Sequence, residues 1–171
     1  MNVLLPVDGS EHSELACQAM LGRPWPSGTR VRILHVLPKF PFDAPTESEA
    51  SLAAPADVDP EHHPASLMEA SAQLTRQAEL LTRRVGEQLR AAGLDVETRI
   101  VHGDARTEIL AEAENWEADL IVLASHGLTG LKRWLLGSVA HSIVSHAHCS
   151  VEIVRAKTPH EHGGKGSSPS H

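Results

Sequence analysis

The sequence is poor in aromatic residues and has no excess of basic charge. Aromatic side chains make up 3% of the 171 residues and tyrosine is absent, so the stacking surfaces on which most single-strand nucleic-acid binders hold bases are missing. The formal net charge is −7 with the histidines neutral, which disfavours binding to a phosphate backbone. We therefore expect no nucleic-acid partner.

Long apolar runs are also missing. The longest, Leu120–Ala124, falls far short of the roughly 20 residues that a membrane-spanning helix needs, so we expect no membrane partner. No basic region precedes the first apolar stretch, so the N-terminus lacks the pattern of a secretory signal. We expect a cytoplasmic location.

Cysteine is scarce, and its placement excludes two kinds of site. Cys17 and Cys149 occur in apolar contexts without the spacing of a zinc site or a redox pair, so we expect buried thiols. Histidine is abundant, with 12 residues, but His62 and His63 have no nearby cysteine and no partner at helical spacing. We expect no metal site.

Strand-length apolar runs alternate with helical patterns, which is typical of a parallel sheet with helices on both faces. Ser10 and Asp104 are candidate N-caps of helices, Ser66 with Glu69 has the spacing of a capping box, and Ser138 opens the last helix. Gly93 is placed to end the helix that follows Ser66. The pattern predicts four helices and an α/β fold arranged as a three-layer sandwich. The five predicted strands are residues 3–7, 30–36, 94–100, 119–124 and 151–154.

The chain has room for one domain. Hydrophobic residues make up 41% of it, which is enough for a single core. We assign this domain to residues 1–156, with a proline-rich excursion at 38–65 that follows neither the strand nor the helix period. Residues 157–171 are rich in Gly, Ser, His and Pro, so we expect a disordered tail.

Two segments of small and polar residues follow predicted strands. Open α/β sheets bind ligands outside the carboxyl ends of their strands, where the strand order reverses. The first strand is followed by Asp8-Gly9-Ser10, and the fourth by a stretch that contains Gly127 and Gly130. Glycines let main-chain N–H groups approach a ligand closely, and residues 137–139 begin a helix whose N-terminus attracts an anion. These segments predict a phosphate-binding site.

On these residues the sequence resembles the universal stress protein family over nearly all of residues 2–155. Val7-Asp8-Gly9-Ser10 is similar to the family's V-D-x-S opening, and residues 117–127 are similar to its fourth strand. Gly127, Gly137 and Ser138 match the last positions of the family's nucleotide-binding loop, G-x2-G-x9-G-[S/T], with Ala124 in place of its first glycine. The resemblance implies a Rossmann-like fold of the adenine nucleotide alpha hydrolase-like type. Its five parallel strands have the order 3-2-1-4-5.

The resemblance also implies a ligand, ATP with Mg²⁺ bridging its phosphate oxygens, and no permanent cofactor. Asp8 would reach the adenine or ribose edge, Val7 and Val36 would wall the base pocket, and Ser138 with Val139 would hold phosphates. The full expected set is Pro6, Val7, Asp8, Val36, Ala124, Gly127, Gly130, Gly137, Ser138 and Val139.

A homodimer joined at the fifth strand is a further implication of the resemblance. Glu152 departs from the family's apolar pattern in that strand. It either points to solvent, pairs with a basic group or weakens the interface.

Each site residue has a structural interpretation beside the functional one. Asp8 is a favoured turn residue, Gly127 and Gly130 are possible turn glycines, and Ser138 is a possible capping residue. It is their combination at this spacing that favours nucleotide binding. Nothing in the chain supplies a nucleophile with an adjacent base, so we expect no catalytic residue and at most slow ATP hydrolysis.

Three functions remain open. The favoured one is an ATP-binding stress or signalling module that acts through its conformation and an unidentified protein partner. The second is a ligand-free homodimeric interaction protein of the same fold, and the third is an ATP-using enzyme of a related fold. Residues 8–12 have neither the Ser-Gly-Gly-x-Asp-Ser loop nor the His-x-x-His signature of such enzymes, which argues against the third.

Overall fold

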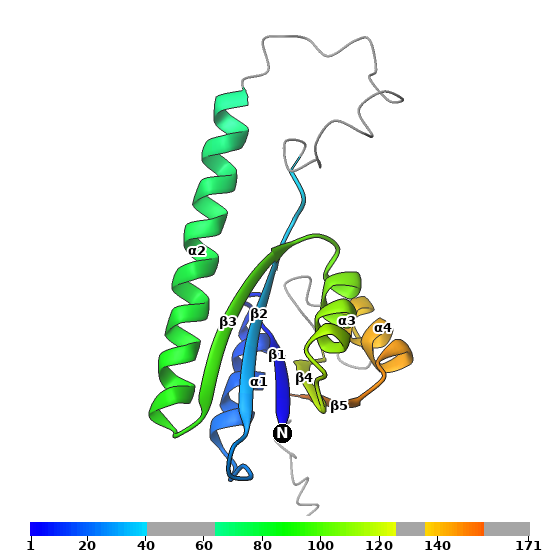
Figure 1. Cartoon of the computed structure of the whole chain (residues 1–171). Coiled ribbons are helices and arrows are strands. Elements are labelled where there is room, and N and C mark those ends of the chain that lie inside the picture. The colour runs from blue at the N-terminus through cyan, green and yellow to red at the C-terminus, as the bar shows by residue number, and fades with distance from the viewer. Residues whose placement is uncertain (41–63, 126–135, 156–171) are drawn as a thin grey trace, which may run out of the picture.

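The computed structural model describes residues 1–40, 64–125 and 136–155. Most of the predicted excursion, residues 126–135 and the predicted tail lie outside the described residues. All strand pairs are parallel, and the strand order is β3-β2-β1-β4-β5, so the predicted fold class and topology are confirmed (Figure 1). The elements are β1 (Asn2–Pro6), α1 (Glu11–Leu21), β2 (Arg30–Leu37), α2 (Pro64–Ala91), β3 (Asp95–His102), α3 (Ala105–Asn115), β4 (Leu120–Ala124), α4 (Ser138–His146) and β5 (Ser150–Val154).

The central strand β1 is apolar on both faces. Val3, Leu4 and Leu5 have no exposed surface, as expected of a parallel strand that helices cover on both sides. Val3 and Leu5 pack in one cluster with residues of α1 and α2, and Leu4 packs in a second cluster with residues of α3 and α4. The sheet therefore forms the middle of three layers, as Figure 1 shows.

The helix ends follow local capping rules, with one correction. Ser10 and Asp104 are N-caps whose side chains accept backbone N–H bonds, as predicted. Helix α2, however, begins at Pro64, two residues before Ser66, so the predicted capping box is wrong and the predicted excursion ends earlier. Proline is favoured at the first helical position because its missing N–H is not needed there. Gly93, with φ +86°, follows the end of α2 as predicted.

The two cysteines differ in burial. Cys17 is buried, and burial together with the charge of Glu14 raises the pKa of its thiol to about 11. Cys149 is only partly buried, which corrects the expectation of two buried thiols. Within the described ranges, no group of three His, Cys, Asp or Glu residues is placed to hold a metal ion. None of the helices there is long and apolar enough to cross a membrane.

A buried carboxylate connects α3 to the sheet. The side chain of Glu112 is 5% exposed and forms ion pairs with Arg32 on β2 and with Arg99 on β3, the latter at 3.0 Å. Arg32 also pairs with Glu97 at 3.1 Å, and its guanidinium lies 4.4 Å from the centre of the Trp116 ring. These contacts hold α3 against β2 and so help to place the first turn of α3 beside the carboxyl end of the sheet.

Replacing Glu112 with alanine should lower the free energy of unfolding by about 3 kcal/mol, because Arg32 is left largely desolvated with Glu97 as its remaining carboxylate partner. Chemical denaturation measures this change. Glu14→Ala is the matched control, since Glu14 forms an exposed ion pair with Arg84 at 3.5 Å and its loss should cost less than about 1 kcal/mol. Equal losses in the two variants would contradict a special role for the buried network.

Candidate functional site

A cavity of about 330 Å³ opens at the carboxyl ends of β1 and β4. These strands are neighbours in the sheet, but the chain runs outward from β1 to β3 before it crosses to β4, so the strand order reverses between them. Ligands of open α/β sheets bind at such a point. The volume also falls within the range of small-molecule sites.

Eight of the ten predicted site residues line this one cavity. They come from the end of β1, from β2, from the end of β4 and from the start of α4, which lie far apart in the chain. The other two, Gly127 and Gly130, lie outside the described residues. The eight are Pro6, Val7, Asp8, Val36, Ala124, Gly137, Ser138 and Val139.

Asp8 makes the turn after β1, as its structural interpretation predicts, and it also lines the cavity. Its Oδ1 accepts a hydrogen bond from the Ser10 backbone N–H at 3.0 Å and another from the Ser10 hydroxyl at 2.6 Å. The first bond is an Asx turn, which aspartate favours. Gly9 between them has φ +79°, a conformation that costs glycine little. Asp8 is the only charged side chain among the described residues that line the cavity.

His35 holds the backbone of the same corner from β2. Its ring Nδ1 lies 2.8 Å from the carbonyl oxygen of Val7. A carbonyl only accepts hydrogen bonds, so Nδ1 is the donor in this contact. Burial lowers the pKa of His35 below its ordinary value of 6.5, while the bond to Val7 and the charge of Asp8 act in the opposite direction. The net effect favours the neutral ring at neutral pH.

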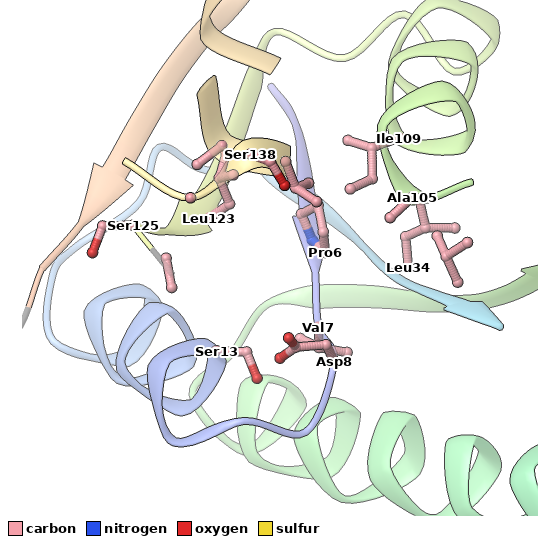
Figure 2. A pocket seen from close by; sticks show the side chains of 15 residues that line it. Pro6, Val7, Asp8, Ser13, Leu34, Ala105, Ile109, Leu123, Ser125 and Ser138 are labelled. Atoms are coloured by element: carbon pink, nitrogen blue, oxygen red, sulfur yellow. The ribbon is translucent and has the colours of Figure 1, made fainter. Parts of the chain in front are cut away.

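The other end of the cavity is the N-terminus of α4. Gly137, which has no side chain to offer, is the N-cap, and Ser138 is the first helical residue instead of the cap. The first N–H groups of a helix have no intrahelical partners, and the helix dipole favours an anion beside them. The Gly137 N–H bonds to the Ser125 carbonyl at 2.8 Å, which fastens this helix end to the end of β4. Figure 2 shows Ser138 and Asp8 on different sides of the cavity.

The walls between these ends include residues that the sequence analysis missed. Leu34 lies two positions before Val36 and therefore on the same face of β2, and Ala105 and Ile109 lie one helical turn apart on α3. These spacings show in the sequence that the residues share a face of β2 or of α3. Nothing in the sequence, however, showed that α3 packs over this end of the sheet. The missed residues are Ser13, Leu34, Ala105, Ile109, Leu123, Ser125 and Ala140.

The described lining is mostly apolar, with four polar side chains. They are the carboxylate of Asp8 and the hydroxyls of Ser13, Ser125 and Ser138. A cavity of this kind suits a ligand with an apolar body, hydrogen-bond donors at one end and negative charge at the other.

A model of the universal stress protein family matches residues 1–155. The chain belongs to this family. A universal stress protein of Methanocaldococcus jannaschii is 29% identical over 154 residues, which cover 90% of this chain and 81% of the relative. The family resemblance seen in the sequence is thereby confirmed.

Two solved universal stress proteins with the same fold carry nucleotides. One was solved in complex with cyclic AMP; it has a TM-score of 0.62 and 21% identity, and the match covers 92% of this universal stress protein and 98% of that one. The other, from Arabidopsis thaliana, has AMP bound; its TM-score is 0.60 at 17% identity, with 90% of each chain covered. At these identities the likeness shows the shared fold, and the nucleotides are properties of those two proteins.

The lowered pKa of His35 predicts a loss of stability in mild acid. The pKa of His35 lies below 6.5 in the folded protein, so as the pH falls the unfolded chain takes up a proton on this residue before the folded protein does. The stability that neutral His35 contributes is therefore fully present above pH 6.5 and is lost as the pH falls through the folded pKa. Urea unfolding at about pH 7.5 and about pH 5.5 tests this in the wild type and in His35→Asn, which lacks the titrating ring. The stability difference between the two proteins should shrink at the lower pH. A constant difference would contradict the assignment to His35.

Proposed function

We propose that this universal stress protein binds an adenine nucleotide, ATP with Mg²⁺, and acts as a stress-response or signalling module through nucleotide-dependent conformation and a protein partner. The observation that carries the proposal is the meeting of separate chain segments around one cavity at the point where the strand order reverses. The nucleotides bound by two solved relatives of this fold support it.

The polarity of the cavity supports one orientation of the nucleotide. The apolar walls suit the base, and the Asp8 carboxylate, which accepts hydrogen bonds only, suits the amino or hydroxyl donors of adenosine. The same negative charge repels phosphate, whereas the N-terminus of α4 attracts it. Adenosine therefore lies toward the end of β1 and the phosphates toward Ser138. Mg²⁺, when bound, would neutralise phosphate charge through the phosphate oxygens.

The lining favours binding over catalysis. Among the described residues that line the cavity there is no histidine, lysine or cysteine. A serine nucleophile needs an adjacent base to be activated. The function proposed is accordingly a change of conformation on binding, which a partner can detect as a shift in population.

We also propose a homodimer at the β5 edge, because an unpaired edge strand tends to pair with another chain. Within the described sheet, β5 has β4 as its one neighbour. Of the three expectations for Glu152, the structure supports pairing with a basic group, since its carboxylate lies 2.7 Å from Arg23. Because the Glu152 carboxylate is paired with Arg23 of the same chain, it opposes the burial of β5 in a dimer interface less than an unpaired charge would.

Saturating ATP with Mg²⁺ should raise the melting temperature of the purified protein. At about 100 times the dissociation constant, a ligand that binds only the folded state contributes about 2.7 kcal/mol, which for a chain of this size is about 5–10 °C. A thermal scan with ATP, AMP, cyclic AMP and GTP measures the shift and the base preference. No shift with any of them would favour the ligand-free interaction protein.

Ser138→Glu tests where the phosphates lie. A glutamate in the first turn of α4 suits the helix dipole, so the unliganded protein should keep its melting temperature. The added charge should weaken ATP binding at least about tenfold, or about 1.4 kcal/mol, while adenosine binding stays within about twofold. Calorimetric titration with both ligands makes this comparison. An equal loss for ATP and adenosine would place the phosphates elsewhere.

A further inference from the structure

We propose that Ser10 is a positioning residue for nucleotide binding, which acts by holding the Asp8 carboxylate in the orientation that meets the ligand. This inference rests on the proposed function and adds to it a residue that does not line the cavity. The juxtaposition that carries it is a continuous chain of hydrogen bonds from α1 through Ser10 to Asp8.

The chain of bonds has a fixed direction. The backbone N–H of Ser13 donates to Oγ of Ser10 at 3.1 Å, and this oxygen in turn donates its hydrogen to Oδ1 of Asp8 at 2.6 Å. The backbone N–H of Ser10 donates to the same Oδ1 at 3.0 Å. Two donors on one oxygen resist rotation of the carboxylate, since any other orientation breaks at least one of these bonds.

Ser10 is buried, so water does not readily replace these bonds. It is 8% exposed, and Ser13 is 7% exposed. Ser13 also returns a bond, because its hydroxyl donates to the Ser10 carbonyl at 3.0 Å. Both residues bonded to Ser10, Asp8 and Ser13, line the cavity. Ser10 therefore connects two lining residues by hydrogen bonds without lining the cavity itself.

Helix capping alone does not account for serine at this position. Asp and Asn cap helices about as well as Ser, and Asp104 caps α3 with a carboxylate in this protein. A carboxylate at position 10 could accept the Ser13 N–H but could not donate to Asp8. A side chain that both accepts from the helix and donates to Asp8 is required, and the serine hydroxyl does both.

The test is a double-mutant cycle with Ser10→Gly, Asp8→Ala and the double variant, with ATP affinity measured by calorimetric titration; alanine removes the oxygen that accepts both Ser10 hydrogen bonds. Glycine removes the hydroxyl but remains an acceptable N-cap, so the fold is retained. Ser10→Gly should weaken ATP binding about tenfold in the wild-type background. In the Asp8→Ala background it should have less than about a twofold effect, because Ser10 then has no side chain to position and residues that act through one contact are not additive.

Two controls separate positioning from general stability. Thr29→Ala removes a buried hydroxyl that donates to the Pro26 carbonyl at 2.7 Å before the start of β2, at the opposite end of the sheet, and should leave ATP affinity unchanged at a similar change of melting temperature. Ser10→Thr keeps the hydroxyl and should restore affinity to within about threefold of the wild type, whereas Ser10→Asp keeps the cap but places a like charge beside Asp8 and should bind no better than Ser10→Gly.

The outcomes distinguish this inference from the proposed function. If the wild type binds ATP and the Ser10 and Asp8 effects add, or if Ser10→Asp binds as well as the wild type, the role of Ser10 is overturned while nucleotide binding stands. If the wild type binds no adenine nucleotide, the proposed function fails and this inference fails with it. A non-additive cycle with rescue by threonine supports both.

Discussion

The rest of the structure depends on the central position of β1. This strand pairs in parallel with β2 on one side and β4 on the other, and helices cover both of its faces. It must therefore be apolar in successive positions, and Val3, Leu4 and Leu5 are completely buried. The same position makes the carboxyl end of β1 one side of the crevice where the strand order reverses, so the constraint that builds the core also locates the cavity.

Hydrogen bonds hold the backbone of the corner after β1. The Val7 N–H continues the pairing with β2 through the Leu34 carbonyl at 2.9 Å, and His35 holds the Val7 carbonyl. Gly9 then provides the left-handed backbone that the turn needs. Hydrogen bonds thus hold the Asp8 carboxylate in the unliganded protein, which would lower the ordering cost of the proposed nucleotide binding. The opposite end offers backbone N–H groups at the start of α4.

Charged residues that break the apolar pattern have identifiable partners. The buried side chain of Glu112, on α3, forms ion pairs with Arg32 and Arg99 of the sheet. Glu152, inside β5, pairs with Arg23, whose guanidinium lies 4.1 Å from the centre of the Trp25 ring. Buried or half-buried charge is tolerated when it is paired in this way. The Glu112–Arg32 and Glu152–Arg23 pairs join segments that are distant in the chain.

The amino-acid sequence by itself determined the order and type of the elements, because parallel strands buried on both faces are continuous apolar runs and the helices between them show the helical period, with side-chain caps at α1 and α3. It also singled out Asp8 and Ser138, because small and polar residues are combined there at one strand end and one helix start, although each alone is also an ordinary turn or capping residue. Only the tertiary structure decided that α3 supplies Ile109 to the cavity wall, that Ser10 bonds to Asp8 as well as to its helix, and that Glu152 meets Arg23. The physical reason is that local periodicity fixes which face of an element is apolar, whereas the partner that meets that face, and the direction of each polar side chain, depend on how distant segments pack.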